Sequence, residues 1–243
     1  MRNVLITGAN RGIGLELTRQ YAHDGDAVLA FCRTPQSADA LNALAHASNR
    51  RVTVHTMDVA DERSIRTAAQ AIGDRPIDIL INNAGIKGGE NQNIDAVDTA
   101  DWIEAFTVMV IGPFRVIQAF LGNLRKAKNP KIMTITSQMG ATTWPMGGSY
   151  TYASAKAAVN RVMIAVARDL EAEVTVNLIH PGWVRTDMGG PDADLTTEES
   201  AAGIRNVIAS ITKADKRKVL QMERGDTPLV GLLPTVRKLR SCQ

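Results

Sequence analysis

The chain has 243 residues, a formal net charge of +3 and a hydrophobic content of 44%, which suit one domain with a large core. Its two cysteines, Cys32 and Cys242, exclude a disulfide framework. No apolar run approaches the roughly 20 residues that span a bilayer, and no secretion signal opens the chain, so we expect a cytoplasmic protein without membrane contact.

Strand and helix patterns alternate along the whole chain, which predicts a parallel sheet covered on both faces. Strands are expected at residues 3–7, 27–32, 51–56, 77–82, 130–136, 174–179 and 217–222. Helices are expected at residues 12–24, 36–46, 61–72, 99–126, 152–172 and 197–211. We therefore expect an α/β fold, a doubly wound domain over residues 1–243 with a seven-stranded parallel sheet and a basic tail at about 230–243.

The first strand runs into a glycine-rich segment, TGANRGIG, at residues 7–14. Strand, glycine turn and helix start follow in the order that holds a dinucleotide phosphate. Glycine permits the backbone angles of such a turn, and the new helix presents free N–H groups to the phosphate. Many strand–turn–helix corners use glycine for steric reasons only, so both interpretations stay open for this segment taken alone.

Tyr152 and Lys156 lie four residues apart, which places both side chains on one helix face. A free tyrosine has a pKa of about 10, and a nearby ammonium lowers it. Such a tyrosine can donate a proton to a carbonyl oxygen as hydride reaches the carbon. A solvated helix face is the commoner explanation for such a pair when nothing else is considered.

Polar clusters follow three of the later strands. Ser137 ends the strand at 130–136, Asn82–Gly85 ends the strand at 77–82, and the segment 180–186 follows the strand at 174–179. Open α/β sheets bind their ligands at the carboxyl ends of their strands, so these clusters point to one site.

The motifs TGANRGIG (7–14), NNAG (82–85), Ser137, YASAK (152–156) and HPGWVRT (180–186) together resemble the classical short-chain dehydrogenase/reductase family. Residues 147–160 and 180–196 look most like the sniffer-like carbonyl reductase and C-factor branch. The resemblance implies a Rossmann-type domain that reduces a ketone, aldehyde or quinone to an alcohol with NADPH. The C-factor likeness keeps a second class open, namely a dinucleotide-binding signalling or interaction protein with little catalytic activity.

The resemblance also assigns roles to residues. Tyr152 would act as general acid, Lys156 would lower its pKa and hold the nicotinamide ribose, and Ser137 would polarise the substrate carbonyl. The implied cofactor-binding residues are Gly8, Asn10, Arg11, Gly12, Ile13, Gly14, Arg33, Asp58, Val59, Asn82, Ala84, Gly85, Tyr152, Lys156, Pro181, Gly182, Val184 and Thr186. The four histidines lack ligand spacing, so we assign no metal.

The second strand leads into Cys32-Arg33-Thr34, without the acidic residue that binds a ribose 2′-hydroxyl in NAD-specific sites. Arg33 and Arg11 can instead converge on the 2′-phosphate of NADP(H) through charge-assisted hydrogen bonds. We therefore expect a preference for NADP(H).

Met109 stands where the family has an asparagine whose main chain holds a water that links the lysine to solvent. In a helix, the Met109 carbonyl would accept from the N–H of residue 113, which is a proline. We expect this carbonyl to recruit another donor, a water included, so that a weakened proton relay persists. Met109 as a core residue without bearing on the site is the alternative.

The irregular segments 86–98, 137–151 and 183–196 all follow strands and should gather over one edge of the sheet. Trp144, Met146, Trp183 and Met188 lie on them and could wall an apolar substrate pocket, or merely cover the core. No nucleic-acid motif accompanies the basic runs at 213–218 and 237–240. The family commonly pairs through the helices at 99–126 and 152–172, which implies a homodimer or homotetramer.

Overall fold

The structure is a computed structural model that describes residues 1–143, 147–211, 219–221 and 230–231. Its strands form one sheet in the order β3-β2-β1-β4-β5-β6-β7-β8. They are β1 Asn3–Thr7, β2 Ala27–Cys32, β3 Val52–Thr56, β4 Ile79–Asn82, β5 Lys131–Ile135, β6 Thr175–His180, β7 Val219–Gln221 and β8 Val230–Gly231. The strands from β3 to β7 pair in parallel, and β8 runs antiparallel to β7. The predicted seven-stranded parallel sheet is confirmed, with β8 as a short addition at its edge.

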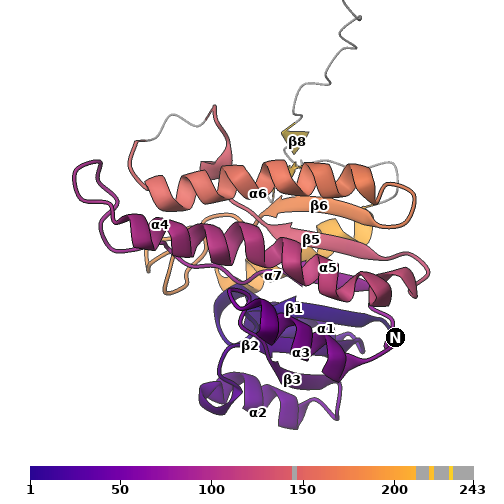
Figure 1. Ribbon diagram of the computed structural model, residues 1–243. Helices are drawn as coiled ribbons and strands as arrows, with labels where there is room; N and C mark the ends of the chain where they lie inside the picture. The colour runs from indigo at the N-terminus through magenta and orange to yellow at the C-terminus, as the bar shows by residue number, and fades with distance from the viewer. Residues whose placement is uncertain (144–146, 212–218, 222–229, 232–243) are drawn as a thin grey trace, which may run out of the picture.

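Helices cover both faces of this sheet, as predicted (Figure 1). They are α1 Gly12–His23, α2 Asp39–Ala47, α3 Glu62–Ile72, α4 Thr99–Phe106, α5 Gly112–Arg125, α6 Tyr150–Asp169 and α7 Thr197–Ser210. One buried cluster joins α3, α5 and α6 to the sheet, and a second joins α1, α2 and α7 to its other face.

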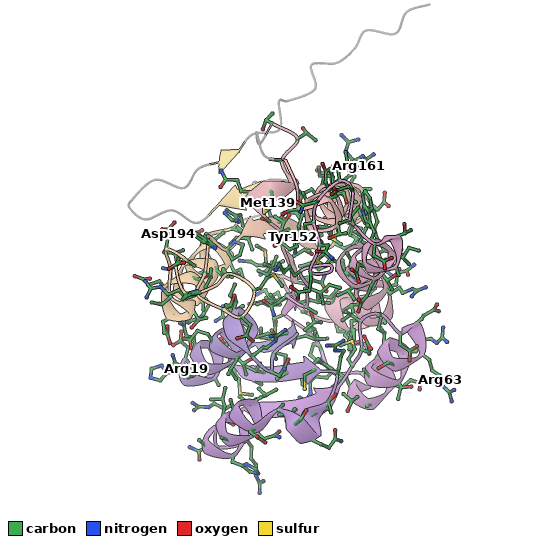
Figure 2. All side chains as sticks on the ribbon, turned by 90° about the vertical axis from the view of Figure 1, so that its left-hand side faces the viewer. Arg19, Arg63, Met139, Tyr152, Arg161 and Asp194 are labelled. Atoms are coloured by element: carbon green, nitrogen blue, oxygen red, sulfur yellow. The ribbon has the colours of Figure 1, made fainter. Side chains whose placement is uncertain are left out.

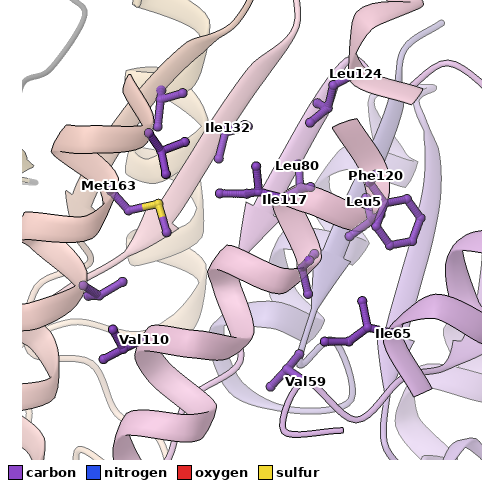
Figure 3. Packing of buried hydrophobic residues seen from close by; sticks show 14 of the residues in the cluster. Leu5, Val59, Ile65, Leu80, Val110, Ile117, Phe120, Leu124, Ile132 and Met163 are labelled. Atoms are coloured by element: carbon purple, nitrogen blue, oxygen red, sulfur yellow. The ribbon is translucent and has the colours of Figure 1, made fainter. Parts of the chain in front are cut away.

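Successive side chains of a strand point to opposite faces of the sheet, so each buried strand contributes to two hydrophobic clusters. Leu5 of β1 faces the cluster of α5 and α6, whereas Val4 and Ile6 face the opposite cluster. Figure 3 shows the first cluster, which includes Ile132 of β5, Ile117 of α5 and Met163 of α6. Because both faces of the sheet are covered, the carboxyl ends of the strands form the edge where polar side chains gather.

The helix predicted at 99–126 contains a wide turn at Thr107–Ile111, where the helix is of the π type. Its closing bond runs from the N–H of Gly112 to the carbonyl of Thr107, five residues back. Pro113 has no N–H with which to continue the ordinary pattern. A π turn of this kind often marks a functional position in a helix.

Other boundaries differ modestly from the prediction. The helix expected at 36–46 begins as a 3₁₀ turn at Pro35–Ser37 and continues as α2, and the helix expected at 152–172 is α6, Tyr150–Asp169. The strand expected at 217–222 is β7, Val219–Gln221. The remainder of the basic tail beyond β8 lies outside the described residues.

The continuous helical stretch Thr99–Arg125 contains an 18-residue window with a mean hydropathy of 1.6, and it is long and apolar enough to cross a membrane by length and composition. The expectation that no such stretch exists was therefore wrong. Half of its most apolar window, 50%, is buried inside this fold, as in a core helix of a globular protein.

Candidate active site

The glycine turn between β1 and α1 is shaped by close contacts that exclude side chains. Gly8 and Gly12 have positive φ angles of 65° and 54°. A Cβ on Gly14 would lie 2.2 Å from the Gly8 carbonyl oxygen, and a Cβ on Gly8 would lie 2.9 Å from the Ala84 Cα. No side chain of the described residues caps the start of α1 at Arg11. Its first N–H groups are therefore available to a phosphate, and the turn fits a dinucleotide.

Thr7 and Asn83 hold this turn against the end of β4, and the sequence interpretation missed both. The Asn83 amide donates to the carbonyls of Thr7 and Gly8, each at 3.0 Å. The Thr7 hydroxyl accepts from the backbone N–H groups of Asn83, at 3.0 Å, and Ala84, at 3.1 Å. Adjacent asparagines at a strand end were the signal that could have identified this connection.

Residues predicted along the adenosine lie at the ends of β3 and β4. The Asn82 side chain donates to the Thr134 hydroxyl at 3.3 Å, and its buried Oδ1 has no partner among the described residues. Such an acceptor suits an incoming hydroxyl donor. The Asp58 carboxylate accepts from the N–H of Ala60 at 2.9 Å, and the Val59 side chain lies in the core.

Lys156 is buried on α6 beside the partly buried Tyr152. Lys156 is 5% exposed, and its ammonium lies 5.5 Å from the centroid of the Tyr152 ring and donates to the Ile135 carbonyl at 2.8 Å. Burial lowers the pKa of Lys156 to about 8. Burial also raises the pKa of Tyr152, and a hydrogen bond with the Ser137 side chain opposes that shift. The expected lowering of the Tyr152 pKa was therefore wrong, because desolvation of the phenolate prevails.

Ser137 follows β5 and caps a 3₁₀ turn at Gln138–Gly140. Its hydroxyl oxygen accepts from the N–H of Met139 at 3.2 Å, which leaves the hydroxyl proton able to donate elsewhere. The turn packs on α6, and Figure 2 labels Met139 and Tyr152 in this region.

The segment after β6 crosses above the glycine turn. Gly182 has a φ of 83°, and a Cβ there would lie 2.3 Å from the Leu195 side chain. The Thr186 methyl group lies 3.2 Å from where a Cβ on Gly12 would stand. Val184 bridges to Leu195, and the Pro181 carbonyl accepts from the Ser200 hydroxyl at 2.8 Å. These contacts place the segment directly beside the glycine turn.

The partly buried His180 lies at the start of this segment, and its buried Nδ1 has no partner among the described residues. Burial and the charge of Lys156 lower the pKa of His180 to about 4. The imidazole is therefore neutral at physiological pH, and Lys156 carries the positive charge of this pair.

Arg11 and Arg33 make different contacts in this structure. The Arg11 guanidinium pairs with Asp187 at 2.5 Å, in the segment after β6. Arg33 lines a cavity of about 510 Å³ together with Lys87. Their convergence on the 2′-phosphate of NADP(H) stays a prediction.

The predicted apolar pocket is described only in part. Trp183 is 52% exposed and Met188 is 43% exposed, so both present apolar surface on the segment after β6. The Trp183 indole donates to the Gly189 carbonyl at 2.9 Å, which fixes its orientation. Trp144 and Met146 lie outside the described residues.

A short-chain dehydrogenase family model matches residues 2–195 of the chain. The C-signal protein of Myxococcus xanthus is 38% identical over 167 residues, which cover 68% of this chain and 99% of that protein. An NADPH-bound carbonyl reductase from chicken fatty liver matches with a TM-score of 0.84 and 32% identity, covering 91% of this chain and 96% of that one. The carbonyl reductase Sniffer of D. melanogaster matches with a TM-score of 0.84, 26% identity and the same coverages. The chain therefore belongs to the short-chain dehydrogenase family of oxidoreductases.

Proposed function

We propose that this protein reduces a ketone, aldehyde or quinone to an alcohol with NADPH. The observation that supports this most is the burial of a lysine beside a protonated tyrosine, at the strand ends that carry Ser137 and the glycine turn. The structural similarity to an NADPH-bound carbonyl reductase supports the same activity.

The residues present fit the cofactor. The backbone of Gly8, Gly12 and Gly14 would cradle the phosphates. Lys156 has three donor protons and uses one of them on the Ile135 carbonyl, so it would hold ribose hydroxyls with the others. Asn82 would accept from an adenosine hydroxyl with its free Oδ1. The segment from Pro181 to Thr186 would position the carboxamide. When bound, the nicotinamide supplies the hydride.

The protein's own side chains then manage the proton. Ser137 donates a hydrogen bond to the substrate carbonyl oxygen and holds it near the phenol. Tyr152 donates its proton to this oxygen as negative charge develops there. Lys156 stabilises the phenolate that remains. The raised pKa keeps Tyr152 protonated at neutral pH, the form that reduction requires.

Initial rates of NADPH oxidation with a panel of ketones, aldehydes and quinones test this function. We expect turnover with at least one substrate class, and slower turnover with NADH. The similarity to C-signal supports a second candidate, a dinucleotide-binding signalling protein. That candidate predicts tight NADPH binding without turnover across the whole panel.

Replacing Arg33 with alanine should weaken NADPH binding by roughly ten- to a hundredfold, the effect of losing one hydrogen bond to a charged group. The affinity for NADH, which lacks the 2′-phosphate, should change little, and Arg63→Ala on exposed α3 serves as a control. Calorimetric titration of both cofactors measures this. Equal or tighter binding of NADH than NADPH by the unmodified protein contradicts the preference.

Met109 contacts the turn that follows β4. It is 2% exposed, and its sulfur lies 3.6 Å from where a Cβ on Gly85 would stand. We expect Met109→Asn to raise turnover modestly, because an amide there restores the side chain that the family uses beside Lys156. The turnover number of the folded variant, compared with the unmodified protein, measures this. Unchanged turnover in a folded but less stable variant would show that Met109 serves packing alone.

Quaternary structure and compartment remain predictions. Ile103, Ile111 and Phe114 are exposed along α4 and α5, at 64%, 42% and 39%. This apolar surface is consistent with the expected pairing into a homodimer or homotetramer. A cytoplasmic location stays an expectation.

A further inference from the structure

Asn160 holds both ends of the turn that carries Ser137. The Thr136 hydroxyl, immediately before Ser137, donates to the Asn160 Oδ1 at 2.5 Å. The Asn160 Nδ2 donates to the carbonyl of Gly140, at the end of the 3₁₀ turn, at 3.3 Å. One side chain therefore connects the residue before Ser137 with the residue that closes the turn.

Asn160 belongs to the same helix face as the proposed proton-transfer residues. It follows Lys156 by four positions and Tyr152 by eight on α6, so the three side chains project from successive turns. A hydrogen bond to Asn160 is thus a hydrogen bond to the helix that carries Tyr152. The two hydrogen bonds of Asn160 therefore connect the end of β5 and the Ser137 turn to α6.

The turn packs closely against the backbone of α6 at Gly140. A Cβ on Gly140 would lie 2.8 Å from the carbonyl carbon of Lys156 and 2.9 Å from its Cβ. Thr136 is 1% exposed, so loss of its acceptor would leave a buried hydroxyl unsatisfied. The turn is therefore pressed against α6 and held there at two points by Asn160.

We propose that Asn160 is a positioning residue that fixes the Ser137 hydroxyl relative to Tyr152 and Lys156. This inference rests on the proposed reductase function, in which Ser137 holds the substrate oxygen. Asn160 touches neither the substrate carbonyl nor the reacting atoms in this account. It acts by keeping the Ser137 hydroxyl within reach of the oxygen that Tyr152 protonates.

The kinetic consequence follows from the sensitivity of proton transfer to position. A displacement of about 1 Å in an aligned group can lower the rate by roughly a hundredfold. We therefore expect Asn160→Ala to lower kcat by about ten- to a hundredfold, with little change in the KM for NADPH. Thr136→Val, which keeps the side-chain volume, should reproduce this loss, and Thr136→Ser should restore most of it.

Asn123→Ala provides a matched control. Asn123 on α5 is also a buried amide, and it donates to the carbonyls of Gly73 at 2.6 Å and Arg75 at 2.8 Å, at the opposite end of the sheet. Its loss should lower the thermal stability without changing kcat or KM. A fall in kcat for Asn160→Ala that Asn123→Ala does not share cannot come from lost stability alone.

Amide hydrogen exchange gives a readout that does not depend on turnover. In full-length protein, a peptide over residues 136–142 should exchange faster in Asn160→Ala and Thr136→Val than in the unmodified protein, Thr136→Ser or Asn123→Ala. Asn160→Asp, which keeps the acceptor for Thr136 but loses the donor to Gly140, should lie between them. It also replaces Asn160→Ala if that variant does not fold.

The outcomes distinguish failure of the proposed role of Asn160 from failure of the proposed reductase function. Faster exchange together with lowered kcat supports Asn160 as a positioning residue. Unchanged exchange at 136–142, or faster exchange with an unchanged kcat, overturns it. If the unmodified protein reduces no carbonyl, the proposed function fails, and so does the positioning of Ser137 for catalysis, whatever the exchange result.

Discussion

Replacing Tyr152 with phenylalanine should lower turnover by roughly two to four orders of magnitude, the usual effect of losing a general acid. The ring and its packing beside Lys156 would remain, while the transferable proton would be lost. NADPH binding should survive, because the glycine turn and Lys156 are unchanged. Single-turnover rates and fluorescence titration of NADPH measure the two effects separately.

Tyr21→Phe is the matched control for this substitution. Tyr21 is buried, its hydroxyl has no partner among the described residues, and its ring lies beside Arg2 and Arg205. It belongs to the cluster on the sheet face opposite to that of Tyr152. Removing that hydroxyl should leave turnover unchanged. Full reductase activity in Tyr152→Phe would show that another group supplies the proton.

Replacing Lys156 with methionine should lower both the turnover and the affinity for NADPH. Turnover should fall by at least about a hundredfold, because the phenolate of Tyr152 loses its stabilising charge. NADPH should bind roughly ten- to a hundredfold more weakly, because a charged donor to the ribose is gone. Lys131→Met is the control, since Lys131 also donates to a backbone carbonyl, that of Ile208, from the opposite end of β5.

The stability of Lys156→Met, compared with that of the unmodified protein, should depend on pH. The pKa of Lys156 is lowered to about 8 in the folded protein. Between pH 8 and the ordinary pKa of a lysine side chain, the unfolded chain therefore binds more protons than the folded protein. The unmodified protein should therefore gain stability as the pH rises through this window. Lys156→Met lacks this gain, so its relative stability should be greatest below pH 8, which thermal unfolding at several pH values measures. A pH-independent difference between the two proteins would contradict the assigned burial of charge.

Much of the fold could be predicted because its signals are local. Alternating strand and helix patterns, and polar clusters at strand ends, placed Ser137, Tyr152 and the glycine turn at one edge of the sheet. The π turn at Thr107–Ile111 was not expected as such, although Pro113 indicated a lost helical bond. The shape of the compensating turn depends on the packing of Gly112 against Val59 across the fold.

Side-chain pairings between distant segments were harder to predict. Asn160 on α6 looks like an ordinary polar position in the sequence, and only the fold brings it to Thr136. Arg11 could reach a phosphate or a carboxylate, and its pairing with Asp187 depends on how the segment after β6 crosses the glycine turn. The rise in the Tyr152 pKa depends on its burial, which helical spacing alone does not reveal.

Transfer of deuterium from NADPH labelled at the nicotinamide C4 tests the central claim most directly. With enzyme and cofactor in equal amounts and a carbonyl substrate from the active class, the account predicts an alcohol labelled on the former carbonyl carbon. Tyr152→Phe should form it roughly two to four orders of magnitude more slowly. Bound NADPH that gives no labelled alcohol with any substrate class, or equal rates in the two proteins, would contradict the account.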